Sequence, residues 1–288
     1  MRVLDLSPHL VHGLGALAGL AAGLFATRVA DDLPRRYAIT HLVQGPARRR
    51  RNVVLVVLCA AIGLWLAHLL TQAGATSVER GLFYFAVNMV LCAGLAAAAA
   101  VDIEHMILPN ELTLGGAVLA LATAHWRGIG LVGALVGTVV SLALTYLPAV
   151  LYKRLRGRSG MGLGDAKLAL LAGAWLGAEG AIFVVFAGAM QSAMCSLIMR
   201  VFGVEFAVPA SVQAELADLR AKADAGDEEA RALLADDPMA ADVGEANEAP
   251  TLATMRLPMG PFLVLACLEF AFARRQILEL FDRYASPP

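Results

Sequence analysis

Long apolar runs constrain this chain more than any other feature, because soluble folds do not bury so many of them. Hydrophobic residues make up 59% of the 288 residues and charged residues only 16%, whereas about a quarter of a typical soluble domain is charged. A bilayer-spanning helix needs about 20 apolar residues. The runs therefore predict an all-α fold, a polytopic membrane bundle of about eight transmembrane helices, at 9–27, 53–73, 81–101, 112–125, 129–151, 167–178, 180–200 and 258–273.

Lys and Arg are divided unevenly between the predicted loops. If the N-terminus lies outside, 17 of the 23 basic residues fall on the inner side, as expected for cytoplasmic loops. The basic run 48–51 is typical of a juxtamembrane anchor that contacts lipid. We therefore expect the lipid bilayer as a partner and no nucleic acid. We also expect the first run to be a retained span, since no clean signal-peptide cleavage site follows it.

Two aspartates stand at the ends of apolar runs. Asp102 closes the run 81–101, and Asp165 opens another, directly after Gly162 and Gly164. A carboxylate in such a place is costly unless it is paired, works, or lies at the water boundary. Taken singly, Asp165 is explained as a helix cap and Asp102 as an interfacial residue. Taken together they predict aspartyl chemistry, because the topology puts both at the cytoplasmic end, where two carboxylates can share one proton.

Other polar residues near these runs have simpler interpretations. We expect Glu104 and Glu111 to be solvated, and Glu269 to form an interfacial ion pair near Arg274. His105 is either an ordinary interfacial histidine or a residue that tunes Asp102.

Pro109 and Asn110 are predicted to shape the turn into the helix that follows, with Asn110 as its cap. The four cysteines all lie within apolar runs and form no Cys-x-x-Cys pair, so the sequence predicts no metal site.

The chain divides into four predicted regions. Residues 1–80 form an N-terminal two-span region with a short basic loop, and 81–203 hold both aspartates. Residues 204–256 form an acidic cytoplasmic insertion of two short helices, the second capped by Asp227, followed by a linker. Residues 257–288 form the last span and tail.

Three stretches carry a resemblance to a known family. VDIEHMILPNELTL and GMGLGDAKLALLAGAWLG are similar to the two aspartate motifs of the prepilin peptidases, a family of Gly-x-Gly-Asp membrane aspartyl proteases. LPMGPFLVLA resembles the segment that opens that family's last span. The resemblance implies Asp102 and Asp165 as the catalytic pair and Gly162 and Gly164 as residues that shape the loop. It implies a structural or substrate-contacting role for Lys167.

The resemblance also implies a reaction. It is the removal of a basic leader peptide from type IV pilin or type II secretion pseudopilin precursors at the cytoplasmic face of the bacterial inner membrane. The peptidase step needs no cofactor. Bifunctional members of the family also methylate the new N-terminus with S-adenosylmethionine and carry two Cys-x-x-Cys pairs after the first span. Here the loop 31–52 has no cysteine and is short, which leaves methylation, and with it S-adenosylmethionine, an open alternative.

Two other functions fit parts of the sequence. A presenilin-like or signal-peptide-peptidase-like intramembrane protease also uses Gly-x-Gly-Asp, but in that family a tyrosine precedes the first aspartate, whereas Val101 precedes Asp102 here. A non-catalytic transporter or assembly factor of a secretion machine is the alternative from a different class.

Overall fold

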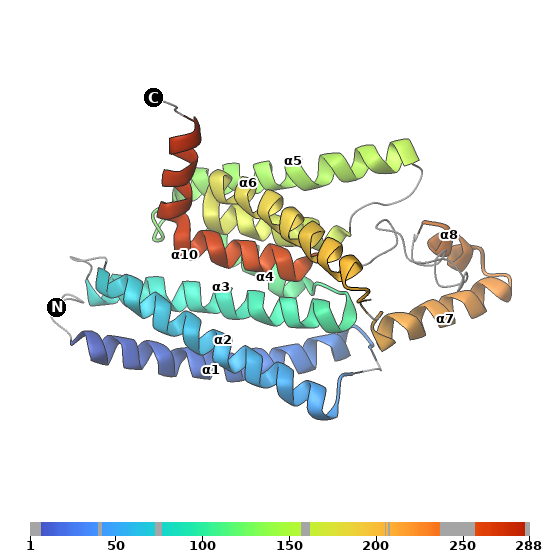
Figure 1. Ribbon diagram of the computed structural model, residues 1–288, viewed down its shortest axis with the longest axis horizontal. Coiled ribbons are helices and arrows are strands. Elements are labelled where there is room, and N and C mark those ends of the chain that lie inside the picture. The colour runs from blue at the N-terminus through green and yellow to red at the C-terminus, as the bar shows by residue number, and fades with distance from the viewer. Residues whose placement is uncertain are drawn as a thin grey trace.

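The computed structural model describes residues 7–39, 42–72, 77–156, 162–204, 206, 208–236 and 257–285. Its regular elements in these ranges are helices, which confirms the predicted all-α class (Figure 1). They are α1 (Pro8–Arg36), α2 (Gly45–Gln72), α3 (Val78–His105), α4 (Asn110–Thr123), α5 (Gly130–Arg156), α6 (Leu163–Val201), α7 (Ala210–Asp224), α8 (Glu228–Asp236) and α10 (Gly260–Ala285).

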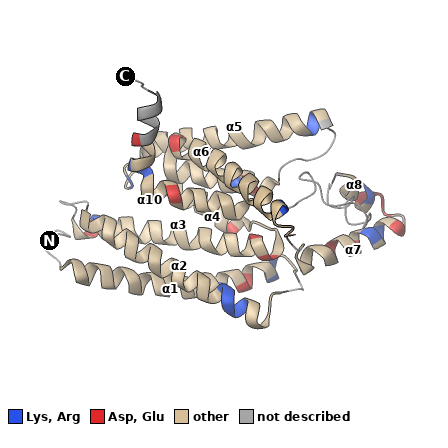
Figure 2. Ribbon diagram, viewed as in Figure 1, with Lys and Arg blue, Asp and Glu red and all other residues tan. Residues whose placement is uncertain are grey.

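The long helices have the length and composition of membrane spans. Within the described ranges, α1, α2, α3, α5 and α6 are long and apolar enough to cross a bilayer. Most acidic and basic residues lie toward the ends of these helices or on α7 and α8 (Figure 2). The structure therefore confirms a polytopic membrane bundle.

Three of the predicted spans are altered in the structure. The span at 112–125 falls on α4, whose 14 residues extend about 21 Å, short of the roughly 30 Å hydrocarbon core. The spans at 167–178 and 180–200 meet within α6, which has 39 residues and a break at Gly177, where φ is 80°. Glycine adopts this left-handed conformation without steric cost. The chain therefore changes direction at Gly177 instead of continuing as one rod (Figure 1).

An arginine satisfies the backbone groups that this break leaves free. A helix that stops exposes its last carbonyl groups. The guanidinium of Arg127, from the turn after α4, donates to the carbonyl oxygens of Trp175 at 2.6 Å and Ala174 at 3.3 Å. The first part of α6, which carries Asp165, is thereby closed by a residue that is distant in the sequence.

α3 is the central helix of the bundle, since α1, α2, α4 and α10 all pack against it. The alanine-rich second half of α3 is buried, and such small side chains let neighbouring helices approach closely. α1 and α2 approach in the same way, because a Cβ on Gly63 would lie only 2.9 Å from the Cα of Gly19.

The insertion forms two helices, as predicted. α7 and α8 extend beyond the end of the bundle at which α3 ends (Figure 1). Asp227 caps α8, because its Oδ1 accepts the N–H groups of Glu229 at 2.9 Å and Ala230 at 3.2 Å. The linker predicted after α8 falls largely at 237–256, which lies outside the described residues.

Candidate active site

Asp102 lies in the last turn of α3 with only 5% of its surface exposed. The helix ends at once, because Met106 takes a left-handed conformation and donates its N–H to the Asp102 carbonyl at 2.8 Å. The Asp102 side chain points to the start of α10, where its Oδ2 accepts the backbone N–H of Gly260 at 3.1 Å. A residue more than 150 positions away therefore fixes this carboxyl group.

Asp165 lies in the first turn of α6 and is half-buried. The helix begins after Gly162, which has an extended backbone and no side chain to cap the helix. Gly164 is needed for packing, since a Cβ at this position would lie 3.1 Å from Cβ and 3.3 Å from Cδ1 of Leu108. Gly164 thus lets the loop after α3 pack against the start of α6.

The two aspartates converge through Leu108. A Cβ on Gly260 would lie 3.3 Å from the Leu108 Cδ1, so this side chain contacts the start of α6 on one side and the start of α10 on the other. Asp165 directly follows Gly164, and Asp102 accepts the N–H of Gly260, so both aspartates lie beside the two glycines that contact Leu108. Two neighbouring carboxyl groups cannot both ionise cheaply, so such a pair tends to share a proton. This arrangement can perform general acid–base chemistry on a bound water.

A chain of polar contacts connects the starts of α4 and α6 with the end of α1. The Lys167 Nζ donates to the Asn110 Oδ1 at 2.8 Å. The Asn110 backbone N–H donates to the Tyr37 hydroxyl at 3.0 Å, and this hydroxyl donates to the Glu111 Oε2 at 2.9 Å. We call Lys167, Asn110, Tyr37 and Glu111 the polar bridge. It holds the Asp165 helix to two other helices from the solvent side.

The prediction that Asn110 caps α4 is wrong. Pro109 is the N-cap residue, and Asn110 is the first helical residue, with its side chain turned to Lys167. Pro109 is buried at this turn, and its carbonyl accepts the Thr113 hydroxyl at 3.1 Å.

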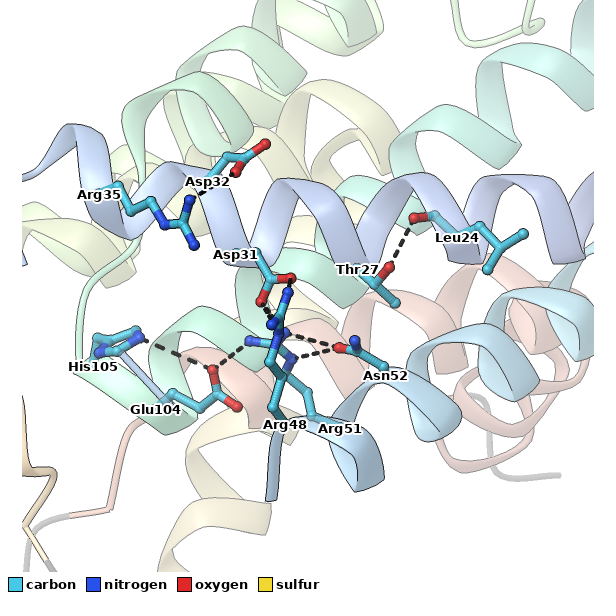
Figure 3. Close-up of polar contacts among 10 residues, drawn as sticks. All are labelled: Leu24, Thr27, Asp31, Asp32, Arg35, Arg48, Arg51, Asn52, Glu104 and His105. Atoms are coloured by element: carbon cyan, nitrogen blue, oxygen red, sulfur yellow. Dashed lines mark hydrogen bonds and ion pairs between the residues drawn. The ribbon is translucent and has the colours of Figure 1, made fainter. Parts of the chain in front are cut away.

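One arginine of the basic run after α1 is buried between helices. The Arg51 side chain is only 10% exposed and pairs with Asp31 of α1 and, at 2.8 Å, with Glu104 of α3. Arg48 also pairs with Asp31 (Figure 3). The predictions of a lipid-facing Arg51 and a solvated Glu104 are therefore wrong. The cluster of Asp31, Arg48, Arg51 and Glu104, named here the arginine cluster, joins three helices one turn from Asp102.

His105 faces the arginine cluster and the insertion. It is 3% exposed, with Nδ1 at 3.2 Å from the Ser211 hydroxyl of α7 and Nε2 at 4.0 Å from Glu104. Its ring nitrogens thus contact groups other than the Asp102 carboxyl.

Glu269 also has a different partner from the one predicted. Its Oε2 accepts from the Gln191 side chain at 2.7 Å. Arg274 pairs instead with Glu179 at 3.0 Å. Glu269 and Arg274 take no part in the contacts described above for Asp102 and Asp165.

Metal ligands do not gather in the part of the chain that the structure describes, where no three His, Cys, Asp or Glu side chains are grouped so as to hold an ion. Cys59, Cys92 and Cys267 are buried and free.

Sequence reasoning missed Tyr37, Arg51 and Gly260 as parts of the site. Gly260 had one available signal, since it lies in the third stretch that carried the family resemblance. The other two gave none.

The region that holds both aspartates matches a known protein family. Residues 89–197 match the model of the Type IV leader peptidase family, and this segment holds both aspartates. The resemblance that the aspartate motifs predicted is therefore confirmed over these residues.

Individual relatives match over a similar length. The Prepilin leader peptidase/N-methyltransferase of Burkholderia pseudomallei strain 1026b is 36% identical over 109 residues, which are 38% of this chain and 35% of the relative. The protein with the same name from Neisseria gonorrhoeae is 32% identical over 115 residues, 40% of each chain. The chain thus matches well under half the length of these relatives. No solved structure matches the chain at a comparable significance.

Proposed function

We propose that this chain, whose residues 89–197 match the model of the type IV leader peptidase family, is a membrane aspartic endopeptidase that removes the basic leader from type IV pilin or type II secretion pseudopilin precursors. One observation carries the proposal. Asp102 and Asp165 come from different helices within the matched segment, and the loop at Leu108 and the start of α10 bring them to one end of the bundle.

The two carboxyl groups divide the chemistry of peptide hydrolysis. One is ionised and takes a proton from a water molecule, and the other is protonated and donates a hydrogen bond to the scissile carbonyl oxygen. The water oxygen then bonds to the carbonyl carbon. When the C–N bond breaks, the leaving amine receives a proton from the carboxyl group that took one from the water, and the new acid is released. In this scheme the Gly260 N–H orients Asp102 for every step.

The four regions of the chain take separate roles in this proposal. The peptidase core is 81–203, and 257–288 adds Gly260 to it. The region 1–80 braces the core through the arginine cluster and Tyr37. The region 204–256 is an acidic cytoplasmic insertion whose α7 contacts α3. Gly162 and Gly164 shape the catalytic loop, and Lys167, Pro109 and Asn110 support it.

The proposed location is the bacterial inner membrane, with the site at the cytoplasmic face. The support is the excess of basic residues in the loops on that side, together with the apolar helices. The partners are the precursors and the lipid bilayer.

N-methylation is a separate question from cleavage. The two relatives named above carry N-methyltransferase in their names. The loop 31–52 of this chain has no cysteine, so it does not contain the Cys-x-x-Cys pairs of bifunctional members. We propose a peptidase that needs no cofactor, and S-adenosylmethionine would be required only if methylation is retained.

Asparagine variants test the proposal. In cells whose only such enzyme is this chain, Asp102→Asn and Asp165→Asn should each accumulate uncleaved precursor, while the wild type yields the mature form. Normal processing in either variant would contradict the proposal and favour a transporter or assembly factor. The mass of the mature N-terminus reports both the cleavage site and any methyl group.

A further inference from the structure

A groove lies beside the candidate site. It lies between α1, α3 and α4, with Leu171 of α6 at its base, and has a volume of about 490 Å³. Small residues from three helices supply much of its wall, namely Ala22, Ala26, Gly94, Ala97, Gly115 and Gly116. Walls of this kind let another helix approach closely in a membrane.

The α4 wall is open at Gly115. A Cβ at Gly115 would meet no atom within 4 Å, whereas a Cβ at the next residue, Gly116, would lie 3.0 Å from the Leu171 side chain. Gly116 therefore packs inward, and Gly115 borders empty space. The groove at this point is not filled by the side chains of the described residues around it.

One end of the groove leads to the candidate site. Among the described residues that line it, Glu111 is the only charged one, and Glu111 belongs to the polar bridge. Its neighbour Asn110 accepts from Lys167, which lies two residues after Asp165. The apolar part of the groove thus ends within a few residues of the catalytic loop.

We infer that this groove seats the apolar helix of the precursor, with the N-terminal end of that helix at Glu111. The inference rests on the proposed function and names where the substrate binds. A protein helix fits the small-residue walls on three sides, and an acidic group suits the positive end of a helix dipole. The chain that continues past Glu111 is basic in such precursors, which matches the same charge. The scissile bond then follows at Asp165 and Asp102.

The test compares two glycine variants and two substrates. Gly115→Leu fills the groove, and Gly13→Leu is the matched control, since a Cβ at Gly13 of α1 also meets no atom within 4 Å. One substrate is a full precursor in proteoliposomes, and the other is a short peptide with the leader and cleavage site but no apolar helix. Gly115→Leu should lower kcat/KM for the precursor about tenfold more than for the peptide, a loss of about 1.4 kcal/mol in binding. Gly13→Leu should leave the ratio unchanged.

Cross-linking provides a second measurement that does not depend on turnover. A photoreactive residue at position 115, in an Asp165→Asn background that holds substrate uncleaved, should cross-link to the apolar helix of the precursor, and the same residue at position 13 should not.

Three results would overturn the inference. These are an unchanged substrate ratio in Gly115→Leu, cross-links from position 115 to lipid alone, and equal cross-linking from positions 13 and 115. If the wild type cleaves no precursor, the proposed function itself fails. If the wild type cleaves the precursor and one of the three results above is found, only the inference about the groove fails.

Discussion

The replacement Gly260→Ala tests how the fold holds Asp102. The backbone of Gly260 does not have a positive φ, so alanine can adopt its conformation. The added Cβ would nevertheless lie 3.0 Å from the Asp102 Cγ, and closer still to Oδ2. Either the carboxyl group or the start of α10 must move, and the hydrogen bond from the Gly260 N–H is lost or distorted.

The size of the effect follows from that hydrogen bond. Bonds to carboxylate groups contribute about 1.5–3 kcal/mol, and about 1.4 kcal/mol changes a rate tenfold. We expect kcat/KM for precursor cleavage to fall about 10-fold to 100-fold. Overpacking costs about 1–3 kcal/mol of stability, and alanine returns up to about 1 kcal/mol by its helix propensity, so the variant should still fold.

The assay measures initial cleavage rates and thermal unfolding on the same purified protein. Gly13→Ala is the control, because its Cβ would meet no atom within 4 Å, and it should match the wild type in both measurements. A Gly260→Ala enzyme that is folded and as fast as the wild type would refute the reasoning that this glycine positions Asp102.

Three further predictions concern the contacts around the site. Arg51→Met leaves Glu104 without its arginine partner and Asp31 with only Arg48, and should lower the free energy of unfolding by about 3–5 kcal/mol. Equal destabilisation by Arg49→Met, at an exposed position of the same run, would argue against a special role for the cluster. Tyr37→Phe removes the hydroxyl that joins Asn110 to Glu111, and unfolding experiments should show a loss of about 1 kcal/mol; unchanged stability would contradict the bridge. The double variant Asp102→Asn/Asp165→Asn should cleave no more slowly than either single variant, because residues that act as one unit are not additive; multiplied losses in steady-state rates would show independent roles.

The features that could be predicted from the sequence are those that local pattern determines. Apolar runs of sufficient length predict membrane helices wherever they occur. The acidic first turn after Asp227 predicts a capped helix, and α8 begins there. The prediction that Asp102 and Asp165 lie at one end counted two full spans between them, whereas in the structure the short α4 and the long α5 take these places.

The features that were missed depend on partners far away in the chain. The sequence around Arg51 is typical of a lipid anchor. In the structure, however, Arg51 is paired with Glu104, 53 positions further on, and is largely buried. Glu269 stands near Arg274 in sequence and yet binds Gln191, 78 positions away. No periodicity or composition reports such pairs, since they are set by which helix faces meet.

The structure shows that the candidate site extends beyond the segment that matches the family. α1 reaches the Asp102 helix through Asp31, Arg51 and Glu104, and it reaches the Asp165 helix through Tyr37, Asn110 and Lys167. Both sets of contacts lie at the same end of α1, so a tilt of this helix would displace both aspartates together. The first helix therefore contacts both motifs from outside, and residues 89–197 contain only part of the contacts around the pair, among them that of Leu108 with Gly164.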